Sequence, residues 1–281
     1  MSEQAAALSS GKTHRDENFP VASVLIAARH RLAILAFYRF VRTADDVADH
    51  PTASPDEKLR LLETMRASLM GGSDASVEGV ALRQVLEARG LSTDHAADLL
   101  EAFRRDVVKL RYADWGELMD YCRYSAMPVG RYVLDVHGEN RALWPLSDAL
   151  CAALQIVNHL QDCAKDYRDL DRVYIPLDTM SEQDATVEAL GGSQSTPALR
   201  AVIAALARRN GELLARAAPF AGQISDRRLA LEVSVIQRLA EDLNDRLLRR
   251  DPLCERVHHR KSDLPGLLFS AVARFLKARL T

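Results

Sequence analysis

The sequence predicts an all-α protein. Apolar residues recur at helical spacing in one window after another, and runs that alternate between apolar and polar residues are almost absent. The chain has 281 residues, of which 48% are hydrophobic, and it shows no sequence repeat or clear linker. A chain of this length can bury a substantial core. We therefore expect one domain of ten or more helices, formed by residues 19–281 after a flexible leader at residues 1–18.

The first half of the chain contains the signals for six or more helices. Residues 20–49 are nearly continuous helix formers, and two helices are expected to meet near residues 29–31. The segment HPTASPDE ends this stretch, and Ser54 followed by Pro55 has the chemistry of a new helix start. GGSDAS predicts a loop. Further helices are expected at residues 77–88, 93–112, 114–124 and 126–137, the last interrupted by Pro128.

The second half begins with a long helix, expected over residues 146–167 and ending before RVYIP, which is typical of a short extended segment. Later helices are expected at residues 198–217, 226–250 and 264–280. The last of these has an apolar side with Arg274, Lys277 and Arg279 opposite it. Two interpretations stay open: an ordinary packed terminal helix, or an interfacial helix in peripheral contact with a membrane.

Composition excludes several classes of protein. A formal net charge of -2 argues against a nucleic-acid partner, which would need a basic face. The four cysteines include no CxxC pair, so neither a zinc site nor a disulfide framework is predicted. The polar N-terminus lacks the apolar core of a signal peptide, and no uncharged apolar stretch reaches 18 residues. The expected location is the cytoplasm.

Two carboxylate clusters carry the chemistry. In YRFVRTADDVAD, the residues Tyr38, Arg42, Asp45 and Asp49 share one helix face, and Asp46 lies off that face. Gln155, Asn158, Asp162 and Asp166 trace an equivalent stripe in QIVNHLQDCAKD. Like charges at this spacing destabilise a helix unless a cation offsets them.

Hard oxygen donors without histidine or cysteine favour Mg²⁺, which proteins commonly hold with carboxylates and substrate phosphates. The expected metal ligands are Asp45, Asp49, Asn158, Asp162 and Asp166, and Arg42 is placed to meet a phosphate. Without the family resemblance, a second interpretation stays open, in which the carboxylates form an acidic helix face in contact with solvent and bind no metal. The Glu255 and His258 pair matches half of a di-iron motif, but no second copy exists.

The motifs resemble the squalene/phytoene synthase family over residues 19–256. Tyr38, Arg42, Asp45 and Asp49 match its first motif. The second motif is matched by Gln155, Asn158, Asp162, Asp166, Arg172, Tyr174 and Pro176, and the region between by Tyr121, Cys122, Ala126, Val129 and Gly130. The family fold is an isoprenoid-synthase-type helical bundle around a central cavity.

The resemblance also implies roles. Tyr38, Asp45, Asp49, Asp162 and Asp166 would be catalytic. The expected substrate-binding residues are Phe19, Arg42, Tyr121, Ala126, Val129, Gly130, Gln155, Asn158, Arg172, Tyr174 and Arg256.

Departures from the family pattern select a subgroup. Gln161 stands where an arginine is usual, Ser23 and Leu239 replace aromatic residues, and Met127-Pro128 replaces small residues. These features resemble the bacterial hopanoid branch, which converts presqualene diphosphate to hydroxysqualene. The resemblance implies Mg²⁺ without NADPH, because water ends the reaction, and coupling to the enzymes before and after it in the pathway. The alternatives are a prenyltransferase that joins two farnesyl or geranylgeranyl diphosphates head to head, and a non-catalytic helical member of the family.

Overall fold

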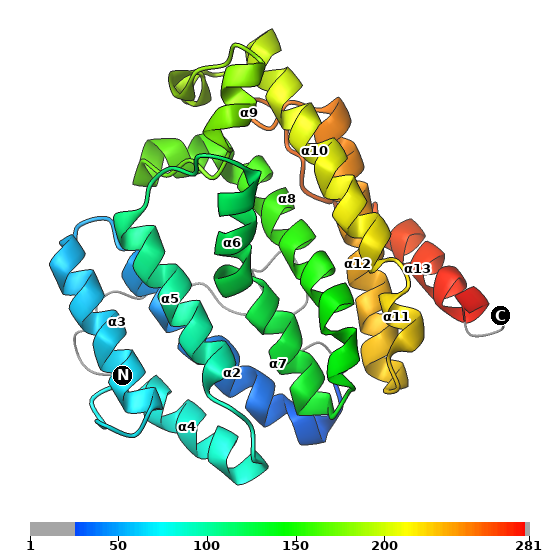
Figure 1. The fold of residues 1–281 in the computed structure, drawn as a ribbon. Coiled ribbons are helices and arrows are strands. Elements are labelled where there is room, and N and C mark those ends of the chain that lie inside the picture. The colour runs from blue at the N-terminus through cyan, green and yellow to red at the C-terminus, as the bar shows by residue number, and fades with distance from the viewer. Residues whose placement is uncertain (1–25, 279–281) are drawn as a thin grey trace. The chain divides into compact units, whose positions relative to one another are not determined.

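The computed structural model describes residues 26–278 and is helical throughout its regular structure. Among these residues the one β-type pairing is an isolated parallel bridge between Arg111 and Val173. The chain forms two compact units, each described by itself. The first unit takes in the described residues up to Lys109 and Pro128–Arg141, and the second takes in Leu110–Met127 and the described residues from Ala142 on. Figure 1 labels the helices of both.

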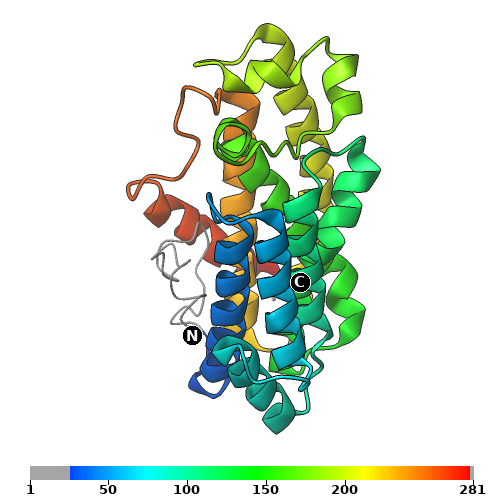
Figure 2. The ribbon, with the colours of Figure 1, turned by 90° about the vertical axis from the view of Figure 1, so that its left-hand side faces the viewer.

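The first unit is built on α2. This helix contacts α3, α4 and α5, and Figure 2 shows α2 and α3 side by side. The core between the helices is apolar, with Phe37 stacked on Tyr132 of α7 at 3.9 Å between ring centroids. The bounds are α2 Ala28–Ala48, α3 Pro55–Leu69, α4 Val77–Arg89, α5 Asp94–Val108 and α7 Met127–His137.

The second unit is built on α8, which contacts α6, α10 and α12. Two buried asparagines link three of these helices. Asn210 donates to Ala153 O at 3.3 Å and to Asn244 Oδ1 at 3.0 Å, and Asn244 donates to Ala207 O at 3.0 Å. The helices are α6 Trp115–Ser125, α8 Trp144–Leu170, α9 Leu177–Glu182, α10 Pro197–Ala217, α11 Phe220–Gln223, α12 Arg227–Arg249 and α13 Leu264–Ala278. Short 3₁₀ turns lie at Arg141–Leu143 and Val187–Gly191.

Local chemistry explains where the helices begin and end. Ser54 Oγ accepts from the Glu57 N–H at 3.2 Å and caps α3, as the sequence indicates. Pro128 does not interrupt a helix, because it lies in the first turn of α7, where proline is tolerated. The break falls instead at Ala126, the residue that ends α6.

Two sequence-based boundaries are wrong by several residues. The helix expected to reach residue 112 ends at Val108, because the Leu110 carbonyl accepts from the Val173 N–H at 2.9 Å and holds the chain extended. The long helix α8 continues to Leu170, past the predicted end at residue 167. The short helices α9 and α11, of six and four residues, escaped prediction because so few residues carry no periodic signal.

Replacing Gly79 by alanine is expected to lower the free energy of unfolding by about 1–3 kcal/mol. A Cβ at Gly79 would lie 2.8 Å from Ser68 Cβ and 3.0 Å from Met65 O, so α4 could not stay as close to α3. Gly211→Ala is the matched control, since its nearest contact would be an ordinary 3.7 Å. Urea unfolding of both variants measures the difference, and equal stability would contradict the close packing.

Candidate functional site

The first carboxylate cluster lies at the end of α2. Arg42 is ion-paired with Asp45 at 3.0 Å and with Asp46 at 2.6 Å. Asp49 ends the helix, and its N–H donates to the Asp45 carbonyl at 2.9 Å. Tyr38 lies one turn before Arg42 on the same helix. The predicted shared face of the helix is therefore present, with Arg42 at its centre.

Negative charge is crowded in this cluster. Burial, followed by the neighbouring Asp49 carboxylate, raises the pKa of Asp45 to about 7, although the Arg42 guanidinium opposes the rise. Asp46 and Asp106 contribute smaller increases in the same pKa. Asp106 comes from α5 and is only 5% exposed. Three further carboxylates, those of Asp46, Asp49 and Asp106, thus lie close enough to Asp45 to disfavour its charged form, an effect that a bound cation would offset.

The second cluster lies on α8, which carries Gln155, Asn158, Asp162 and Asp166 as predicted. The pKa of the neighbouring Cys163 thiol reflects its burial and the negative charge of this stripe. Burial raises the pKa of this thiol to about 12, and the Asp166 and Asp162 carboxylates add to the rise against an opposing backbone hydrogen bond at Ala164. A thiol in this state is protonated and is a poor metal ligand. The stripe itself offers only the amide and carboxylate groups of Gln155, Asn158, Asp162 and Asp166.

An aromatic cluster lies beside this stripe within the second unit. His159 stacks on Tyr174 with 3.6 Å between ring centroids, and Tyr121 lies 5.3 Å from Tyr174. Tyr112 completes the group, 5.3 Å from Tyr121. Burial, with the Arg172 guanidinium as a second cause, lowers the pKa of His159 to about 3. The imidazole is therefore neutral, and its Nε2 accepts from the Gln155 amide at 3.1 Å.

The segment after α8 positions two of the predicted substrate-binding residues. Asp171 adopts a left-handed conformation at φ 52° and ends the helix. The Arg172 N–H then donates to the Asp166 carbonyl at 3.1 Å, which ties the segment to the end of the carboxylate stripe. Arg172 and Tyr174 are 6% and 8% exposed. A guanidinium is well suited to bind an anion such as a phosphate.

The donors of each cluster fit a hard divalent cation. Asp45 and Asp49 in the first unit, and Asn158, Asp162 and Asp166 in the second, offer carboxylate or amide oxygens. These are the ligands of Mg²⁺ and Ca²⁺ rather than of zinc or copper. The crowding around Asp45 is the observation that supports this fit, because a divalent cation would offset it.

The other predicted residues are placed as follows. Tyr121 and Ala126 are buried in the second unit, whereas Gly130 and the partly exposed Val129 lie on α7 in the first. Arg256 lies in the turns after α12 and is exposed, so its predicted contact with a diphosphate stays a prediction. Phe19, Ser23 and the expected leader lie outside the described residues.

The structure adds two residues that were not predicted from the sequence, and it shows a new property of a third. Asp106 is an acid on an amphipathic helix, and its burial could not be read from the local pattern. Tyr112 joins the aromatic cluster only because the chain turns at Leu110. Both polar atoms of the Gln161 side chain are buried and have no hydrogen-bond partner among residues 26–278.

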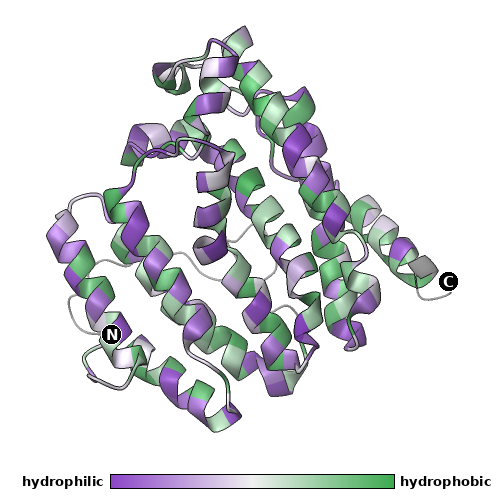
Figure 3. Cartoon of the chain, in the orientation of Figure 1, coloured by the Kyte–Doolittle hydropathy of each residue, from purple (hydrophilic) through white to green (hydrophobic). Residues whose placement is uncertain are grey.

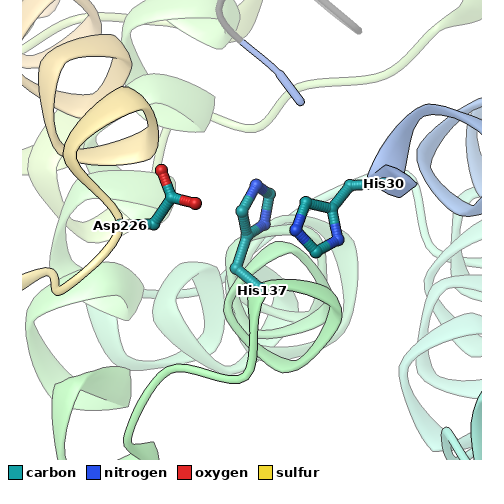
Figure 4. A group of neighbouring side chains, drawn as sticks. All are labelled: His30, His137 and Asp226. Atoms are coloured by element: carbon teal, nitrogen blue, oxygen red, sulfur yellow. The ribbon is translucent and has the colours of Figure 1, made fainter. Parts of the chain in front are cut away.

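Two histidines form a separate pair in the first unit. The ring centroids of His30 and His137 are 4.2 Å apart. Figure 4 shows the two rings next to each other. The Arg89 guanidinium holds this end of the unit together through His30 Nδ1 and the Val136 carbonyl, both at 3.1 Å. Asp226, also drawn in Figure 4, belongs to the second unit. The imidazole pair is accounted for by packing within its own unit.

A family model described as squalene/phytoene synthase matches residues 12–263. The hydroxysqualene synthase of Zymomonas mobilis is 55% identical over 271 residues, which cover 96% of this chain and 91% of that protein. The hydroxysqualene synthase of Rhodopseudomonas palustris is 55% identical over 269 residues, which cover 96% of this chain and 92% of that protein.

Solved structures give a consistent result. The squalene synthase HpnC from Alicyclobacillus acidocaldarius has a TM-score of 0.74 and 30% identity, covering 88% of this chain and 92% of that one. A dehydrosqualene synthase in complex with ligand has a TM-score of 0.78 at 21% identity, covering 98% and 97% of the two chains. The predicted all-α fold of the isoprenoid-synthase type is confirmed.

Proposed function

The chain belongs to the squalene/phytoene synthase family, and from this premise we propose that it is a hydroxysqualene synthase acting on presqualene diphosphate. The observation that carries the proposal is the 54–55% identity to three hydroxysqualene synthases. By contrast, the phytoene synthase of Thermus thermophilus is 27% identical over a similar length. The resemblance read from the motifs is thus confirmed at the level of the family.

We propose that the two carboxylate clusters bind the diphosphate group through Mg²⁺. Asp45 and Asp49 would hold metal in the first unit, and Asn158, Asp162 and Asp166 would do so in the second. Bound Mg²⁺ would neutralise the diphosphate and make it a better leaving group. Arg42, Arg172 and Arg256 would bind the remaining diphosphate oxygens, since guanidinium groups match phosphate geometry.

The aromatic cluster supports the second half of the proposed reaction. Departure of diphosphate leaves a carbocation that rearranges before water adds to it and releases a proton, giving hydroxysqualene. The faces of Tyr121 and Tyr174 attract positive charge, and the neutral imidazole of His159 does not repel it. Tyr38, Ala126, Val129, Gly130 and Gln155 are proposed to line the substrate site.

The remaining parts of the proposal concern location and partners. None of the helices in residues 26–278 has the length and hydropathy needed to cross a bilayer. We propose a cytoplasmic location, with peripheral contact at the inner face of the membrane, and functional coupling to the enzymes that supply presqualene diphosphate and consume hydroxysqualene.

Product analysis tests the proposed activity. Purified protein with presqualene diphosphate and Mg²⁺ is expected to yield hydroxysqualene in equal amounts with and without NADPH, because water ends the reaction. Gas chromatography with mass detection identifies the product. Squalene formed only with NADPH would contradict the proposal. A second incubation supplies farnesyl diphosphate instead of presqualene diphosphate. Consumption of farnesyl diphosphate would indicate head-to-head prenyl transfer.

A further inference from the structure

The C-terminal helix α13 has a second apolar face beyond the one that packs on the protein. Leu267 and Ala271 are buried, and the Ala271 carbonyl accepts from Ser234 Oγ of α12 at 3.0 Å. Leu268, Val272 and Leu276 follow the same spacing of four, one residue later. They therefore line a strip about 100° around the helix. They are 43%, 39% and 55% exposed.

Phe269 extends this strip and is 78% exposed, the highest value among the exposed large hydrophobic residues of residues 26–278. We name Leu268, Phe269, Val272 and Leu276 the outer strip of α13. Figure 3 shows hydrophobic residues of α13 in green, interrupted by a hydrophilic part in purple. Helices that pack against a protein on one side normally turn charged residues outward, so this outer strip needs an explanation.

Charge around α13 indicates what covers the strip. The chain as a whole has a formal net charge of -2. From residue 260 to the end it contains only one acid, Asp263, which is ion-paired with Arg246 at 2.8 Å. The same stretch has five cationic residues, namely Arg260, Lys261, Arg274, Lys277 and Arg279. Of these, Arg274 is ion-paired with Glu241 of α12. Arg260 and Lys261, just before the helix, are exposed.

An apolar strip flanked by cations matches the surface of an anionic bilayer, where apolar side chains enter the interface and cations meet the headgroups. We propose that the outer strip of α13, with Arg260 and Lys261, binds the protein reversibly to anionic lipid. The inference rests on the proposed function for one point: a water-insoluble polyprenyl substrate and its alcohol product both reside in the bilayer. A bound enzyme could exchange both with it.

Vesicle flotation tests the proposal. The full chain is expected to float with vesicles of phosphatidylglycerol and phosphatidylcholine, and less with phosphatidylcholine alone. Phe269→Asp combined with Leu276→Asp should reduce the bound fraction about tenfold. Arg260→Gln with Lys261→Gln should weaken binding to the anionic vesicles only. Met70→Asp is the matched control. Met70 is 58% exposed, close to the 55% of Leu276, but it lies at the end of α3.

Other occupants of the strip give different results. If the wild-type chain does not float, or if the Phe269 and Leu276 variant floats equally well, the proposal is overturned. A dimer that the same variant converts to monomer in sedimentation equilibrium would assign the strip to a second copy, which also overturns it. If vesicle binding appears only after residues 1–25 are removed, those residues occupy the strip in the full chain. This result would also overturn the proposal.

Turnover of detergent-dispersed presqualene diphosphate separates this proposal from the proposed function. The α13 variants are expected to retain wild-type turnover in detergent while losing vesicle binding, which supports the surface assignment. A wild-type chain that binds vesicles but does not consume presqualene diphosphate would overturn the proposed function and support the lipid surface.

Discussion

Replacing Asp162 by asparagine is expected to lower the turnover of presqualene diphosphate by about 100-fold or more, and Asp49→Asn should do the same. Asparagine keeps the shape of the side chain but removes the charge that would hold Mg²⁺. The two residues lie in different units and different motifs. Equal losses would show that both carboxylate clusters serve one reaction.

Stability measurements separate this effect from unfolding. Both variants should melt at the wild-type temperature or slightly above it, because each removes one charge from a crowded cluster. Asp74→Asn is the control, since Asp74 is 79% exposed and pairs with Arg83 in a loop. Unfolded Asp49 or Asp162 variants would instead identify these carboxylates as structural.

Removing divalent metal is expected to lower turnover by about 10³-fold, at least as much as either aspartate variant does. Metal ions supply several kcal/mol of charge stabilisation in such reactions. Dialysis against EDTA followed by addition of Mg²⁺ should restore full turnover. Titration calorimetry should show that inorganic diphosphate binds only in the presence of the metal.

The Asp162→Asn variant is the control for the metal-removal experiment. If the second cluster binds the metal, the variant should require a higher Mg²⁺ concentration for half-maximal turnover. Wild-type turnover that persists in EDTA would contradict a metal-dependent reaction.

The helices and the order of the carboxylate residues could be predicted because both depend on local spacing. Tyr38, Arg42 and Asp45 fall on one face of α2, and the stripe from Gln155 to Asp166 lies on α8, as their intervals indicate. Periodicity is a property of neighbouring residues, so it survives without knowledge of the fold. The family motifs then added roles that spacing alone could not assign.

Features that depend on contacts between distant segments could not be predicted. Asp106 joins the first cluster from α5, and Tyr112 joins the aromatic cluster because Leu110 pairs with Val173. The neutral state of His159 follows from its burial, which no local pattern records. The central cavity, the single domain of residues 19–281 and the ligand roles of individual residues stay predictions.

The burial of His159, which stacks on Tyr174, has a consequence for acid stability. In an unfolded chain an imidazole titrates near its ordinary value of 6.5, whereas burial lowers the pKa of His159 to about 3 in the folded chain. As the pH falls from about 6.5 toward about 3, the unfolded chain takes up a proton that the folded chain refuses, so the free energy of unfolding decreases. The ring that keeps the aromatic cluster uncharged thus also makes the second unit sensitive to acid.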